Sequence, residues 1–121
     1  MVRDKILKFL EAAALSIQDK KGENIIGIDV SHFSTLTNYF IVAQGNVSRH
    51  VRALSKEVVE TLSDMGVDPL NIEGLKHGDW VVLDYGDFII HLMQEDMREK
   101  YRLEEIWKEG RIVDLHLRAA I

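Results

Sequence analysis

The chain has 121 residues, and 20 acidic against 15 basic side chains leave a formal net charge of −5. Domains typically contain roughly 100–200 residues, so we expect one domain over residues 1–121. The chain has no cysteine, which excludes disulfide scaffolds, iron–sulfur clusters and thiolate zinc sites and suits the cytoplasm. The acidic balance argues against direct dependence on nucleic acid and favours a basic protein surface as partner.

A first helix is predicted over residues 2–19, because apolar side chains recur there at spacings of three and four residues. Gly22 follows, where a glycine can end a helix. The segments 24–30 and 38–43 are short and rich in β-branched or aromatic residues. Each of them therefore predicts a strand.

A second helix is predicted up to Met65, because its apolar residues are again spaced by three and four positions. Asn46 or Ser48 can cap its amino end through a side-chain oxygen. Pro69 prevents the helix from continuing. Residues 70–73 then predict a short edge strand.

Two strong strands, 80–83 and 88–93, are separated by a short glycine-containing turn and predict a β-hairpin. The register that follows from a turn centred on Tyr85-Gly86 places Trp80 opposite His91. Side chains alternate across a strand, so the hairpin has two distinct faces. The apolar face, expected in the core, comprises Val81, Leu83, Phe88, Ile90 and Leu92. The mixed face comprises Trp80, Val82, Asp84, Asp87, Ile89 and His91.

The mixed face is the first candidate for function, because a tryptophan among polar groups is a typical binding anchor. The alternative is that a helix covers this face and Trp80 belongs to the core. The pattern alone does not decide between the two. Asp84, Asp87 and His91 could form an acid–base cluster, but aspartates beside a glycine turn more often bond the local backbone.

The last predicted helix covers residues 97–109, and the apolar tail 111–121 either docks on the domain or reaches a second subunit. The expected architecture is of the α+β type, with a mixed sheet of about five strands flanked by helices. No apolar run is long enough to cross a membrane. The histidines lack metal-ligand spacing, so we expect no metal, and the sequence has no Walker loop or dinucleotide fingerprint, so we expect no cofactor.

Several of these segments together resemble the ribosomal silencing factor family, also called RsfS or Iojap. The resemblance covers about residues 5–110. In the amino-terminal half it rests on Lys21, Ile25-Ile26, Asp29-Val30, Leu36 to Val42, Gly45-Asn46 and Ser48 to Val51. In the carboxyl-terminal half it rests on Glu73-Gly74, Trp80 to Asp87, Ile90-His91, Arg98, Tyr101, Leu103-Glu104 and Trp107.

The resemblance implies a fold similar to nucleotidyltransferases but no catalysis. It implies binding to the large ribosomal subunit through universal ribosomal protein fourteen, which obstructs joining of the small subunit and lowers translation when nutrients are scarce. The family tryptophan that contributes to this contact corresponds to Trp80. We therefore expect a partner-binding patch that comprises Trp80, Asp84, Tyr85, Asp87, His91, Arg98, Tyr101 and Glu104.

Three positions depart from the family pattern. Asn38 stands where aspartate is usual, Val47 where serine is common, and Lys100 where many members have a hydrophobic residue. Two alternatives remain open. One is a nucleotide-binding enzyme with a site at Gly45, Asn46 and Arg49, where a strand leads into a helix amino end. The other is a dimeric structural module, and a homodimer is also compatible with ribosome binding.

Overall fold

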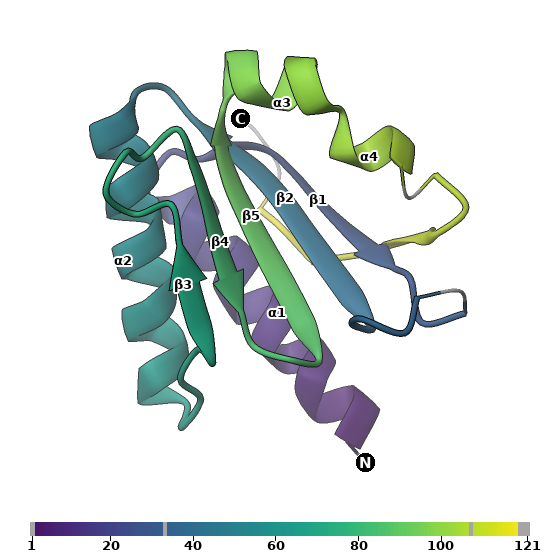
Figure 1. The fold of residues 1–121 in the computed structure, drawn as a ribbon. Helices are drawn as coiled ribbons and strands as arrows, with labels where there is room; N and C mark the ends of the chain where they lie inside the picture. The colour runs from purple at the N-terminus through teal and green to yellow at the C-terminus, as the bar shows by residue number, and fades with distance from the viewer. Residues whose placement is uncertain (1, 33, 107, 119–121) are drawn as a thin grey trace.

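The computed structural model describes residues 2–32, 34–106 and 108–118 and has a mixed sheet at its centre (Figure 1). The elements in chain order are α1 (Val2–Asp19), β1 (Glu23–Asp29), β2 (Tyr39–Gly45), α2 (Ser48–Asp64), β3 (Asn71–Glu73), β4 (Trp80–Asp84), β5 (Phe88–Gln94), α3 (Glu95–Tyr101), α4 (Leu103–Ile106) and β6 (Arg111–Val113). The sheet order is β3-β4-β5-β2-β1-β6. The predicted α+β class is confirmed, with six strands in place of about five.

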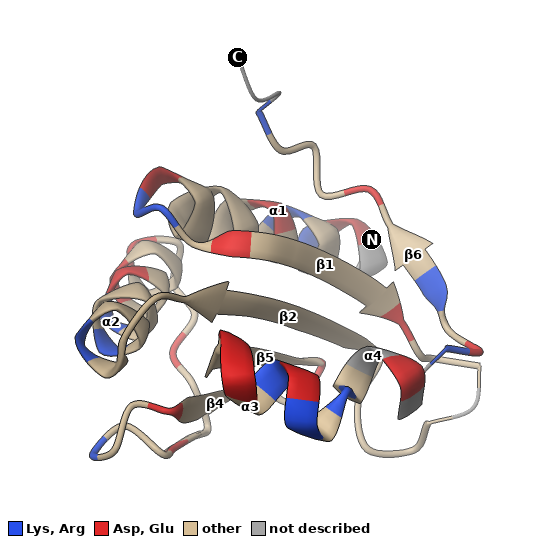
Figure 2. Ribbon diagram, turned by 90° about the horizontal axis from the view of Figure 1, so that it is seen from above, with Lys and Arg blue, Asp and Glu red and all other residues tan. Residues whose placement is uncertain are grey.

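The two long helices, α1 and α2, cover one face of the sheet (Figure 2). Their apolar stripes meet the strands there, and Leu10, Leu54, Ile41 and Ile90 are all fully buried. Burial of one such side chain contributes roughly 1.5–3 kcal/mol. The main core therefore lies between the sheet and this helix pair.

The opposite face of the sheet is covered only in part, by the short helices α3 and α4 (Figure 2). Leu103 of α4 is buried with Val42 of β2 and Met93 of β5. A second small cluster contains Phe40 and Ile89. This face thus has a thinner apolar layer than the first, and the mixed face of the hairpin belongs to it.

The predicted hairpin register is wrong by two residues. Val82 lies opposite His91, and Trp80 lies opposite Met93. The turn is centred one residue later than expected, because the backbone N–H of Tyr85 donates to the carbonyl of Phe88 at 3.0 Å. A shift of two residues keeps each side chain on its face, so the predicted division into two faces survives.

The last predicted helix, 97–109, is in fact two short helices. Arg102 separates α3 from α4 with a left-handed backbone at φ 46°, and its N–H bonds the carbonyl of Arg98. This geometry ends α3 at Tyr101, about two turns before the predicted end at residue 109. Trp107, one of the residues on which the family resemblance rests, lies outside the described residues.

The tail docks on its own chain as far as it is described. β6 pairs antiparallel with β1, and Leu115 is buried against the backbone of Gly27. The Gln18 amide donates to the carbonyl of Arg118 and accepts from its N–H, both at 2.9 Å. Residues 111–118 thus close the β1 edge of the sheet and contact α1.

The amino end of α2 suggests a stability test. Val47, not Asn46 or Ser48, occupies the position before the helix, with an extended backbone and no side-chain capping bond. Val47→Ser supplies a hydroxyl that can accept a bond from a free helix N–H. We expect this change to raise the free energy of unfolding by about 1 kcal/mol, measured by urea denaturation. Val47→Ala is the matched control, and equal stability of both variants would contradict the capping explanation.

Candidate functional site

Trp80 stands at the start of β4 on the thinly covered face and is half-buried. Its indole Nε1–H donates to Nδ1 of His91, on β5, at 3.1 Å. The indole can only donate, so Nδ1 carries no proton and the neutral ring holds its hydrogen on Nε2. The Trp80 ring is therefore fixed in orientation by a bond inside the protein, and its exposed part is apolar.

His91 is the buried support of this tryptophan. Only 7% of its surface is exposed, and its ring stacks on Phe40 with 5.5 Å between centroids. Burial lowers the pKa of His91 from 6.5 to about 4, because the charged imidazolium would lose its solvation. His91 is thus neutral at physiological pH. It acts here as a positioning residue, not as a surface contact.

Tyr101 adds a second aromatic ring to this part of the surface. It lies at the end of α3, 43% exposed, with its ring centroid 5.0 Å from that of Trp80. The ammonium of Lys100 lies 5.5 Å from the Tyr101 ring, close enough for a cation–π contact. Trp80 and Tyr101 together form what we call the aromatic surface.

A polar groove of about 530 Å³ borders α3 beside the aromatic surface. Arg98 crosses one side of it and donates to the carbonyl of Asn24 and to Oε1 of Gln44. These bonds fasten α3 to β1 and β2. The groove is lined by three carboxylates, Glu95, Glu99 and Glu105, and by two guanidinium groups, Arg98 and Arg102. Arg102 pairs with Glu105 at 3.5 Å. The small excess of carboxylates beside the aromatic surface suits a basic partner.

The structure separates other predicted patch residues from Trp80. Asp84 lies at the far end of β4 and accepts a bond from the Gly86 N–H at 2.8 Å, and Asp87 is exposed in the same turn. This is the local role that aspartates commonly have in turns. Glu104 falls in α4, but its side chain lies outside the described part of the chain.

Tyr85 does not join the patch either, because it faces the opposite side of the sheet. It is buried in the main core and stacks on Phe88, with 4.8 Å between ring centroids. Burial, followed by the negative charge of Asp68, raises the pKa of Tyr85 to about 12. The expectation that Tyr85 contacts a partner beside Trp80 is therefore corrected by its position.

The sequence reasoning missed six residues that line the groove: Asn24, Gln44, Glu95, Glu99, Arg102 and Glu105. One signal was present: Glu95 and Glu99 are spaced by one helical turn and so share a side of α3. Asn24 and Gln44 gave no signal, because only the pairing of β1 with β2 brings them to the same edge.

The turn considered for nucleotides, Gly45-Asn46, is occupied by a side chain of the protein. His50 Nδ1 accepts the N–H of Asn46 at 3.0 Å, and its Nε2 lies 2.7 Å from the carbonyl of Lys20. A Cβ at Gly45 would lie only 3.1 Å from Val51. Close packing against Val51 therefore explains the glycine at position 45. The imidazole of His50 fills the place where an anion would approach the backbone N–H of Asn46.

Among the described residues, no group of three or more histidine, aspartate or glutamate side chains lies within reach of one metal ion. None of the helices in this part of the chain has the length and apolar character needed to span a membrane.

The low pKa of His91 predicts a pH dependence of stability. The unfolded imidazole titrates near 6.5 and the folded one near 4, so unfolding takes up a proton at acidic pH. The contribution of neutral, buried His91 to the free energy of unfolding is complete above about pH 6.5 and is lost as the pH falls toward 4. Between pH 7 and pH 5 this loss is about 2 kcal/mol.

Urea denaturation of the parent and of His91→Asn at both pH values isolates the loss that is due to His91. The asparagine keeps an acceptor for the Trp80 indole but does not titrate. An equal loss in both proteins would contradict the assignment.

Comparison with known proteins identifies the family. The family model described as "Ribosomal silencing factor during starvation" matches residues 3–120. The chain is 31% identical over 106 residues to the ribosomal silencing factor RsfS of Bacillus subtilis, covering 88% of this chain and 90% of that relative. A crystal structure of a Chromobacterium violaceum protein matches with a TM-score of 0.81 at 34% identity, covering 93% of each chain.

A further relative comes from a eukaryote. The mouse protein named "Mitochondrial assembly of ribosomal large subunit protein 1" is 32% identical over 94 residues, which are 75% of this chain and 41% of that protein. The match of the family model over nearly the whole chain shows that this protein belongs to the ribosomal silencing factor family.

Proposed function

We propose that the protein is a translational repressor of the cytoplasm that binds the large ribosomal subunit and sterically blocks association of the small subunit. The contact on the ribosome is universal ribosomal protein fourteen. The observation that carries this proposal is the aromatic surface, Trp80 with Tyr101, beside a groove lined by carboxylates. The name of the mouse relative, which concerns assembly of the ribosomal large subunit, supports the same partner for this chain.

The aromatic surface has the properties of a binding anchor. Tryptophan and tyrosine supply large contact areas and dominate many interfaces. The bond from Trp80 to His91 and the packing against Tyr101 hold the indole before the partner arrives. Little side-chain entropy is then lost on binding. Because Nε1 already has its acceptor, the partner contacts the apolar part of the ring.

Charge supplies the second element of recognition. Three glutamates, Glu95, Glu99 and Glu105, outnumber the two arginines that line the groove next to the aromatic surface, and the whole chain carries a net charge of −5. A basic ribosomal protein meets a complementary surface here, which raises the association rate more than the final affinity. Arg98 holds α3 in place for this contact through its bonds to Asn24 and Gln44.

The proposed mechanism needs no chemical step. Bound by one face, the domain occupies space that the small subunit requires, so the binding energy alone produces repression. The relatives are named for silencing, which is a regulatory role. The nucleotide-enzyme alternative is less favoured, because His50 fills the turn that it requires.

Trp80→Ala is the direct test of the anchor. We expect it to weaken binding to isolated large subunits by about 2–4 kcal/mol, or roughly 30- to 1000-fold, because it removes the centre of the aromatic surface. Co-sedimentation with large subunits measures the affinity. Light scattering after addition of small subunits measures the block of association, which should weaken in parallel.

Two variants control for folding and position. Trp80→Phe keeps an aromatic ring but loses the bond to His91, so it should retain more affinity than Trp80→Ala. Ile112→Ala removes an exposed apolar side chain from β6, away from the aromatic surface, and should bind as the parent does. If folded Trp80→Ala co-sediments as tightly as the parent, Trp80 is not the anchor. If the parent binds large subunits but does not slow association, the steric mechanism is wrong.

A further inference from the structure

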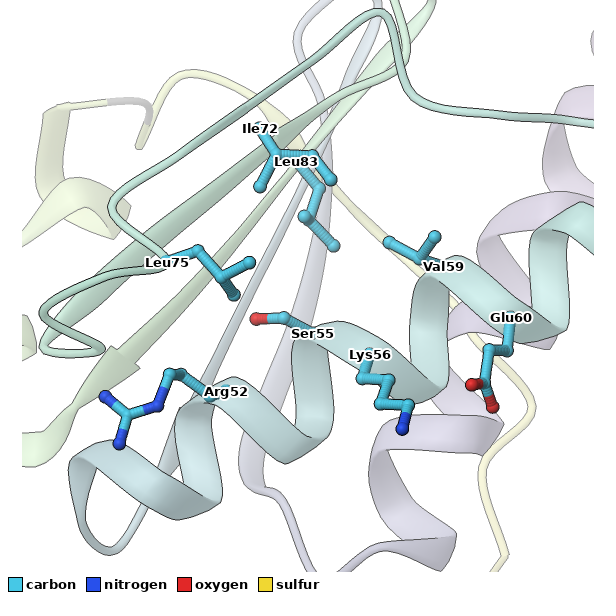
Figure 3. A pocket seen from close by; sticks show the side chains of 8 residues that line it. All are labelled: Arg52, Ser55, Lys56, Val59, Glu60, Ile72, Leu75 and Leu83. Carbon is cyan, nitrogen blue, oxygen red and sulfur yellow. The ribbon is translucent and has the colours of Figure 1, made fainter.

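A second groove lies on the other side of the sheet, between α2 and the edge strand β3, and we call it the α2–β3 groove. It has a volume of about 460 Å³, and its accessible surface is almost wholly apolar. Figure 3 shows Ile72, Leu75 and Leu83 facing Ser55 and Val59 of α2. Sites for small molecules typically have volumes of roughly 300–1,000 Å³ and apolar linings. The groove therefore has the size and character of a small-molecule site.

The interior of the groove offers apolar contact, not hydrogen bonding. Leu83 is fully buried, and only 1% of Ser55 is exposed. The Ser55 hydroxyl donates to the carbonyl of Val51 at 2.9 Å, so its donor is already used. Leu75 and Ile72, on the β3 side, are 42% and 38% exposed. An alkyl chain that covers these side chains removes apolar surface from water, which favours binding.

The loop after β3 is fixed in place beside this groove. Nη1 of Arg52 lies 3.3 Å from the carbonyl of His77 and 3.5 Å from that of Lys76. A Cβ at Gly78 would lie only 2.8 Å from the carbonyl of Ser48. The loop is thus held against α2, and the groove is formed before any ligand arrives.

Two cations on the rim of the groove have binding capacity to spare. Arg52 and Lys56, one helical turn apart, both line the groove, and side chains of this kind place an aliphatic stem on apolar surface and the charge in water. No carboxylate of the described residues lies within ion-pair distance of the Lys56 ammonium. Arg52 uses only Nη1 toward the loop. Its Nε and Nη2 donors have no acceptor in the described part of the chain, so they remain for a ligand.

The charges also give the groove a direction. Glu60 lines it one turn beyond Lys56, so a negative group is attracted to the Arg52–Lys56 end and repelled from the other. A carboxylate suits a guanidinium and an ammonium, because both form charge-assisted hydrogen bonds with it. The ligand that fits has one anionic head and an apolar tail.

We propose that the α2–β3 groove binds the free anion of a medium-chain alkyl carboxylic acid. Its carboxylate contacts Arg52 and Lys56, and its alkyl chain covers Leu75 and Leu83 and extends toward Val59. The groove lies on the sheet face that carries α1 and α2, whereas the aromatic surface lies on the other face. The ligand therefore leaves Trp80 free, and this proposal does not depend on the proposed function.

A series of simple alkyl probes tests the proposal on the full chain. Octanoate, nonanoate and decanoate are titrated by calorimetry at concentrations below micelle formation. Each additional methylene that enters the groove should tighten binding by about fourfold. Octanol keeps the chain length of octanoate but has no charge, so it should bind roughly tenfold more weakly. Amide chemical shifts in ¹H–¹⁵N spectra should change in α2 and in residues 70–78, while the indole N–H of Trp80 stays in place.

Two variants separate the head of the ligand from its tail. Lys56→Glu should weaken octanoate by roughly fivefold or more and leave octanol unchanged, because it replaces attraction by repulsion. Leu75→Ala should weaken both probes, because it removes apolar contact. The matched controls are Lys8→Glu in α1 and Leu36→Ala before β2, which make the same changes at exposed positions outside the lining of the groove. Both should bind as the parent does.

Three results would overturn the proposal. A parent chain that shows no saturable binding of any of the alkyl carboxylates has no such site. Octanol that binds as tightly as octanoate, or octanoate whose affinity Lys56→Glu does not change, removes the carboxylate from the recognition. Chemical shifts that change around Trp80 and not along α2 place the ligand on a different surface.

Discussion

The parallel pairing of β2 with β5 is the constraint on which the rest of the structure depends. Both strands are buried along nearly their whole length, so both faces of the sheet need an apolar cover. Two long helices supply that cover on one face and bury a deep core. On the other face, α3 and α4 are the only helices that the described residues supply, and they leave the Trp80 end of the hairpin half open. The candidate site exists because the second cover is incomplete.

The sequence predicts those parts of the fold in which local pattern and tertiary packing agree. The two long helices and the central strands follow from apolar spacing, and the division of the hairpin into two faces follows from alternation. The hairpin register does not follow, because the turn is set by the bond between Tyr85 and Phe88. The break at Arg102 also escapes prediction, since a left-handed arginine has no marker in the sequence.

The candidate site is predictable to a similar degree. Trp80, Tyr101 and Arg98 could be identified, because the resemblance to the family marks them and the structure places all three near α3. Asp84 and Tyr85 share the same motif but lie at the hairpin turn and in the main core. Adjacency in a sequence motif does not fix adjacency on a surface when strands alternate and span the sheet.

The contact between Gln18 and Arg118 has a consequence for how the protein forms. These two residues are separated by nearly the whole chain, yet their mutual bonds join α1 to the tail. The β1 edge gains its neighbour β6 only after residues 111–113 have been synthesised. Contacts so distant in sequence slow folding, because a long loop must close first. An amino-terminal portion emerging from a ribosome therefore keeps one side of its sheet incomplete until residues 111–118 have emerged as well.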